Sequence, residues 1–140
     1  MIIIGFANNT SKLLPRIFCR TPRHCAPIVR VASNKYIMYQ FVRRGTIAQI
    51  SLNSRAIKLL SAHGWRFVAV KCALPCDFMR CARRARTCVA LCKYAINIYA
   101  PFIQTPRALY KSLKCKVQSS KCNYFCHREG ATRPWRSSKY

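Results

Sequence analysis

Acidic side chains are almost missing from this sequence. Asp77 and Glu129 stand against 26 Lys and Arg residues, which gives a net charge of +24 over 140 residues. Average globular domains have about 25% charged residues, of both signs. Glycosidase-type catalysis needs two neighbouring carboxylates, and Ca²⁺ or Mg²⁺ sites need several oxygen ligands. The composition therefore argues against both kinds of site and leaves nearly every cation without an acidic partner.

Glycine clusters and long apolar runs are also absent. The four glycines, at positions 5, 45, 64 and 130, are too far apart to form a glycine-rich phosphate loop. The apolar start, residues 1–7, has no basic segment before it, so we expect no secretory signal. The apolar stretch 94–103 contains Pro101 and is too short to cross a bilayer. We therefore expect no transmembrane helix and a cytoplasmic location.

Cysteine is abundant, with ten residues, but no Cys-x₂-Cys pair occurs. Zinc ribbons and knuckles usually need that close spacing to present two sulfurs to one ion. Thiols in a reducing cytosol stay unpaired. Buried thiols, a zinc site and disulfides all remain open alternatives, and the sequence assigns no metal ligand and no cofactor.

Proline and charge patterns divide the chain into three parts. Residues 1–34 carry Pro15, Pro22 and Pro27 among arginines, which predicts an irregular basic segment. Residues 35–117 are expected to form a single small α+β domain. Residues 118–140 are polar and basic, which predicts a disordered tail.

Within the central part, residue patterns predict specific elements. Aromatic and β-branched residues at 35–42 and 46–50 predict a β-hairpin. Residues 54–63 predict a helix that ends at Gly64, and residues 65–71 predict a strand. Apolar residues at helical spacing predict one amphipathic helix over 77–96. Thr105 and Pro106 are typical of a helix start, and that helix is predicted to continue to residue 117.

Residues 53–71 read Asn-Ser-Arg-Ala-Ile-Lys-Leu-Leu-Ser-Ala-His-Gly-Trp-Arg-Phe-Val-Ala-Val-Lys. This segment resembles the opening of the HicA-type (YcfA-like) mRNA interferase toxins. The resemblance implies a double-stranded-RNA-binding-like α-β-β-β-α unit, endoribonuclease activity and an antitoxin protein as a partner. The family continues with Lys-Gly-Ser-His, which holds its catalytic histidine, whereas here Cys72 follows Lys71. We therefore assign no catalytic residue and interpret the chain as a degenerate or frameshifted HicA-like toxin.

Basic side chains are the candidate contacts to nucleic-acid phosphates, because Arg and Lys bind oxyanions with charge-assisted hydrogen bonds. The resemblance places some of them near RNA, and the predicted basic helices supply the others. The nucleic-acid-binding candidates are Arg55, Lys58, Arg66, Lys71, Arg80, Arg83, Arg84, Lys111 and Lys114.

Aromatic residues offer a second mode of binding, because exposed rings can stack on unpaired bases. The candidates are Tyr36, Tyr39, Phe41 and Trp65, and the alternative for each is a place in the core. The sequence thus predicts a basic protein that binds nucleic acid, RNA in preference to DNA. Two alternatives stay open: a product with no selected biochemical function, and a protein whose basic amphipathic helix 77–96 lies on a membrane surface.

Overall fold

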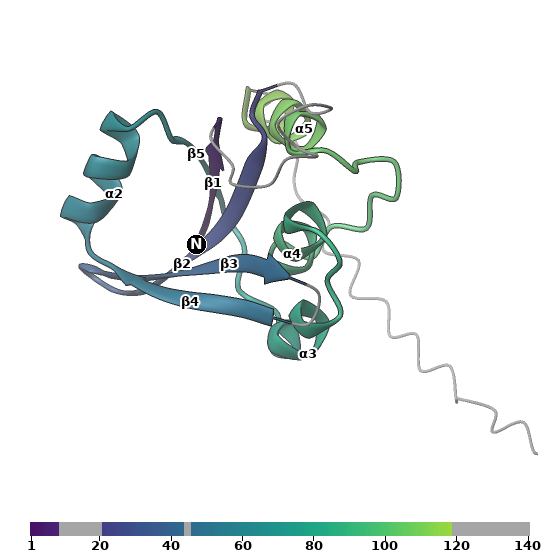
Figure 1. The fold of residues 1–140 in the computed structure, drawn as a ribbon, viewed down its shortest axis with the longest axis horizontal. Coiled ribbons are helices and arrows are strands. Elements are labelled where there is room, and N and C mark those ends of the chain that lie inside the picture. The colour runs from purple at the N-terminus through teal and green to yellow at the C-terminus, as the bar shows by residue number, and fades with distance from the viewer. Residues whose placement is uncertain (9–20, 44–45, 119–140) are drawn as a thin grey trace, which may run out of the picture.

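A five-stranded antiparallel sheet forms the centre of the protein (Figure 1). The computed structural model describes residues 1–8, 21–43 and 46–118. The strand order is β4-β3-β2-β1-β5, and the elements confirm the expected α+β class. The strands are β1 (Ile2–Ala7), β2 (His24–Ala32), β3 (Lys35–Arg43), β4 (Thr46–Leu52) and β5 (Arg66–Val70). The helices are α2 (Ser54–Ala62), α3 (Phe78–Arg83), α4 (Cys88–Ala95) and α5 (Pro106–Gln118).

Helices α3, α4 and α5 cover one face of the sheet. Alternate residues of a strand point to the same face, and Ile2, Ile4 and Phe6 of β1 are buried against Leu109 and Leu113 of α5. A neighbouring cluster joins Tyr39 of β3 to Phe78 of α3 and to residues of α4. This side of the sheet therefore holds most of the buried apolar side chains, and it fixes the position of α5.

The other face of the sheet is covered less completely. Figure 1 shows α2 on the opposite side of the sheet from α4 and α5, and α2 has no buried residue. Trp65 and Phe67 stack on each other here, with ring centroids 6.4 Å apart and planes 17° apart. A Cβ atom at Gly5 would lie 3.0 Å from Cε3 of Trp65. Glycine at position 5 therefore allows the two rings to approach the backbone of β1.

The predicted unit of helix, glycine and strand is confirmed. Asn53 begins α2, where its side-chain oxygen accepts a hydrogen bond of 2.8 Å from the Ala56 N–H. Gly64 follows the helix with a φ of 86°, a backbone conformation that favours glycine. β5 then starts at Arg66 and pairs with β1 at the edge of the sheet. The hairpin of β3 and β4 and the start of α5 at Pro106 also match their predictions.

The prediction that residues 1–34 are irregular is wrong, and the expected domain boundary at residue 35 is wrong with it. This segment contains β1 and β2, and β1 lies between β2 and β5 in the sheet. The apolar run of residues 2–7 is typical of a strand buried on both faces. Pro27 is tolerated because the register between β2 and β3 begins at Ile28, just beyond it. The predicted tail, residues 118–140, lies outside the described residues from position 119 onward.

The single helix predicted over 77–96 is also wrong, because α3 and α4 are separate helices. Arg84 ends α3, and Thr87 begins α4 by accepting a hydrogen bond of 3.1 Å from the Ala90 N–H. Asp77 makes no side-chain cap at α3, and its carboxylate instead accepts from the Cys81 thiol. In the described residues α2 is followed by one strand, β5, and then by α3. The α-β-β-β-α order that the resemblance implies is therefore not reproduced.

Candidate nucleic-acid interface

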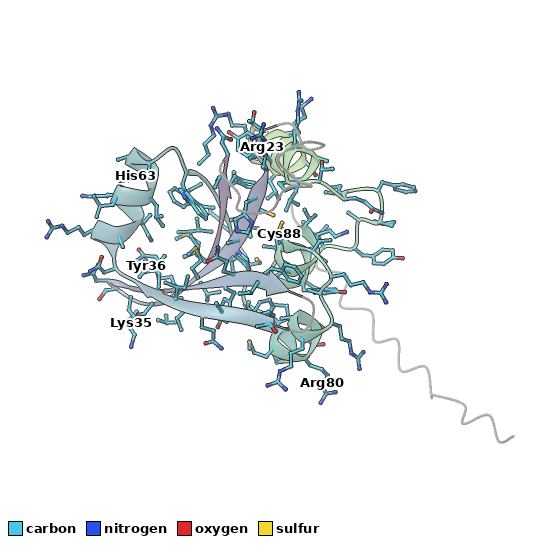
Figure 2. The ribbon with its side chains drawn as sticks, in the orientation of Figure 1. Arg23, Lys35, Tyr36, His63, Arg80 and Cys88 are labelled. Atoms are coloured by element: carbon cyan, nitrogen blue, oxygen red, sulfur yellow. The ribbon has the colours of Figure 1, made fainter. Side chains whose placement is uncertain are left out.

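The nine predicted phosphate contacts are all exposed, but they lie in separate places. Arg55 and Lys58 are on α2, across the sheet from α5, and Lys71 directly follows β5. Arg80 and Arg83 lie on α3, and Arg84 directly follows it. Figure 2 shows Arg80 well away from His63, which follows α2. Arg66 and Lys114 come together at Tyr110, where β5 meets α5, and Lys111 lies about one helical turn before Lys114 on α5.

Arg66 and Lys114 converge on the hydroxyl of Tyr110. Arg66 comes from β5 and Lys114 from one turn further along α5, and both lie close enough to this phenol to lower its pKa. The ring of Tyr110 packs edge-on against Phe6, with centroids 5.0 Å apart, and Nζ of Lys114 lies 5.4 Å from the ring centroid. The buried strand β1 therefore fixes the centre of this basic group.

Two further cations of α5 extend the group. Arg107 lies three residues before Tyr110 and Lys114 four residues after it, so both share its face of the helix. Lys111, four residues after Arg107 and three before Lys114, borders these two cations on the side away from Tyr110. We call Arg66, Arg107, Tyr110, Lys111 and Lys114 the α5 patch. Arg107 was not among the predicted phosphate contacts. The position of Arg66 beside Tyr110 is what identifies the face of α5 that carries the cations. Like charges at this spacing are unfavourable in isolation, so the patch is suited to an anion.

Within the described residues, no acidic side chain belongs to α5 or β5, the elements that form the α5 patch. Asp77, before α3, is the only acidic side chain among residues 1–8, 21–43 and 46–118. Partial burial raises the pKa of Tyr110, but hydrogen bonds with Lys114 and Arg66 and their positive charges outweigh this effect and lower it below its usual 10. The two positive charges beside the phenol therefore favour negative charge placed between Arg66 and Lys114.

Lys93 is a cation with a structural role. Its ammonium group donates hydrogen bonds of 2.9 Å to the Ala100 carbonyl and 3.1 Å to the Ile103 carbonyl. These bonds hold the connection between α4 and α5 against the end of α4. Lys93 therefore supports the backbone and is not part of the α5 patch.

The predicted stacking residues lie mainly in packed regions. Tyr39 is buried against Phe78, with ring centroids 5.0 Å apart, and Phe41 packs beside the same cluster. Tyr36 and Trp65 are half-buried on the other face of the sheet. The sequence reasoning missed Tyr99 and Phe102, each of which is 94% exposed. The sequence around these two residues is a short apolar run, which does not indicate that their side chains are exposed.

Three cysteines gather between β2 and α4. Cys25 and Cys92 are fully buried, Cys88 is partly buried, and all three are free thiols. Burial raises the pKa of Cys25 and of Cys92, and a hydrogen bond with Cys25 together with burial raises that of Cys88. Neutral buried thiols behave as small apolar side chains. In the part of the chain that the structure describes, no group of three His, Cys, Asp or Glu side chains is arranged to hold a metal ion.

The chain matches no family model, no curated protein and no solved structure. Among the described residues, no helix is both long and apolar enough to cross a membrane. The candidate interface therefore rests on its own geometry, and the resemblance of residues 53–71 to HicA-type toxins stays a prediction.

Proposed function

We propose that this protein binds nucleic acid, RNA in preference to DNA, through the α5 patch. The observation that supports the proposal is the convergence of Arg66 and Lys114 on Tyr110, on elements that carry no acidic side chain in the described part of the chain. Cations held at fixed positions and without acidic partners attract phosphates strongly, because each contact releases counterions. The preference for RNA rests on the resemblance of residues 53–71 to an RNA-directed family.

The scaffold supports this function by keeping the α5 patch in one arrangement. Leu109 and Leu113 anchor α5 in the core below β1 and β5, and Phe6 supports the ring of Tyr110. A preorganised group loses little side-chain entropy on binding. Arg66 and Lys114, both beside the Tyr110 hydroxyl, can form charge-assisted hydrogen bonds with phosphate oxygens.

Two triple variants of equal charge test the proposal. The first replaces Arg66, Lys111 and Lys114 with glutamine, and the second does the same to Arg80, Arg83 and Arg84. Each removes three positive charges from exposed positions, so folding should persist, and circular dichroism checks it. Fluorescence anisotropy measures binding to a single-stranded RNA of about 12 nucleotides, a typical site size.

The first variant should bind at least about tenfold more weakly than the second, because charge-assisted hydrogen bonds contribute about 1.5–3 kcal/mol each. Equal losses in the two variants would mean that net charge alone attracts RNA and that the α5 patch has no special role. A larger loss in the second variant would move the interface to α3.

The origin of the chain is a separate proposal. We infer from residues 53–71 that the chain is a degenerate or frameshifted HicA-like toxin. Translation of its coding DNA in all three frames tests this idea. A continuation into Gly-Ser-His in a neighbouring frame after Lys71 would support it, and its absence from every frame would contradict it.

A further inference from the structure

Tyr99 and Phe102 project from the connection between α4 and α5. Both side chains are 94% exposed, the highest exposure among the described large apolar residues. Figure 1 shows this connection extending outward from the body of the protein before it enters α5. Two large rings thus stand in water within four residues of each other.

The backbone that carries these rings is held in place. Lys93 bonds the carbonyls of Ala100 and Ile103, and the Ile103 N–H donates to the Ala100 carbonyl at 3.1 Å. Ile98 and Ile103, on either side of the two rings, pack against the core cluster below β1 and β5. The exposure of Tyr99 and Phe102 is therefore a property of a folded connection with both ends anchored.

Open aromatic rings on a strongly basic protein suit an unpaired nucleic-acid base. At 94% exposure both faces of each ring are open to solvent, and any base can stack on such a face. Paired bases inside a duplex offer no free face to a side chain, so such a ring can stack only on unpaired bases. The connection leads into α5 at Pro106, which places Arg107 of the α5 patch five residues after Phe102. The chain's charge of +24 favours an anionic partner over a neutral one.

We infer that the protein selects single-stranded over duplex RNA, with Tyr99 and Phe102 stacking on unpaired bases while the α5 patch holds the phosphates. This inference rests on the proposed binding function. It assigns the preference for single-stranded RNA to two uncharged residues. The inference can therefore fail while the protein still binds nucleic acid through the α5 patch.

Three double variants of the full chain test the inference. Tyr99→Ala with Phe102→Ala removes both rings, Tyr99→Leu with Phe102→Leu keeps apolar bulk without a π-face, and Tyr99→Phe with Phe102→Tyr keeps both rings. The matched control is Val31→Ala with Leu59→Ala, at positions 49% and 54% exposed on other elements. Probes are a single-stranded RNA of about 12 nucleotides, the corresponding RNA duplex, and vesicles containing anionic phospholipid.

The Ala and Leu variants should each bind the single strand at least about tenfold more weakly than the wild type, because stacking on one base is worth roughly 5-fold to 150-fold in affinity. Their affinity for the duplex and the salt dependence of binding should not change, since no charge is lost. The Phe/Tyr exchange and the control should bind like the wild type.

Other outcomes overturn the inference in distinguishable ways. If the Ala variant binds the single strand as well as the wild type, the rings do not stack on bases, although the α5 patch can still hold phosphates. If the Leu variant retains binding, the contact is apolar and not stacking. If the Ala variant loses vesicle binding and keeps RNA binding, the connection is a membrane contact. If the wild type binds neither RNA probe, the proposed function itself fails.

Discussion

Replacement of Lys93 by methionine should both destabilise the protein and loosen the connection that carries Tyr99 and Phe102. Methionine keeps most of the apolar stem but removes the ammonium group that bonds the Ala100 and Ile103 carbonyls at 2.9 and 3.1 Å. Hydrogen bonds that involve a charged group contribute about 1.5–3 kcal/mol each. Because these carbonyls lie on a partly exposed connection, water can replace part of the interaction. We therefore expect a loss of about 2–3 kcal/mol in the free energy of unfolding, below the sum for two such bonds.

Urea unfolding followed by circular dichroism measures this loss, and the m-value should stay constant because the folded state remains compact. Lys71→Met is the control, since Lys71 is exposed and such a change is usually worth less than about 0.5 kcal/mol. Chymotrypsin, which cleaves after aromatic residues, should cut faster after Tyr99 or Phe102 in the Lys93 variant. A Lys93 variant as stable as the Lys71 variant, with an unchanged rate of cleavage, would refute the structural role of Lys93.

Three further predictions concern the sheet, the phenol and the thiols. Gly5→Ala should lower the free energy of unfolding by about 1–3 kcal/mol, since its Cβ would lie 3.0 Å from the Trp65 ring; urea denaturation giving no change would show that the ring moves freely. RNA affinity should fall as pH rises toward 10, because ionised Tyr110 neutralises Arg66 and Lys114, and Tyr110→Phe should remove that part of the pH dependence; identical pH profiles would contradict this. The free energy of unfolding should fall above about pH 9, because the thiols of Cys25, Cys88 and Cys92 ionise in the unfolded chain but stay neutral in the folded protein. The loss should be up to about 1.4 kcal/mol per pH unit for each thiol. Cys25→Ala should make that slope shallower, and an unchanged slope would mean that the burial of Cys25 is unimportant.

Local signals in the sequence were enough to predict several elements. The helix of residues 54–62 has its Asn53 cap and Gly64 stop within a few residues, and the start of α5 has Thr105 and Pro106. Such signals act between neighbours in the chain, so they can be read without the fold. The hairpin of β3 and β4 is equally local, because its two strands follow each other directly.

The remaining elements depend on contacts between distant residues. Prolines made β2 appear irregular, yet β2 is the central strand and pairs with both β1 and β3. The pairing of Ile4 in β1 with Val68 in β5 likewise joins residues far apart in the sequence. Helical periodicity also does not show that Phe78 of α3 packs on Tyr39 of β3, a contact between residues far apart in the sequence. Tertiary packing overrides local propensity in such cases.

The candidate site was predictable in its residue types but not in its arrangement. Charge counts pointed to arginines and lysines throughout residues 55–114, and the structure separates them onto α2, α3 and α5. Only the packing of Tyr110 on Phe6 shows that Arg66 belongs with Lys114. The backbone that carries Tyr99 and Phe102 is bonded by Lys93, which lies six residues before Tyr99 and nine before Phe102.

The salt dependence of single-stranded RNA binding tests the central claim most directly, because it counts phosphate contacts. The logarithm of the association constant should fall by at least about 3 units per unit of the logarithm of salt concentration, for the four cations of the α5 patch at roughly 0.7 each. Replacing Arg66, Lys111 and Lys114 by glutamine should reduce that slope by about 2. A flat response in the wild type, or an unchanged slope in the triple variant, would contradict binding of nucleic acid through the α5 patch.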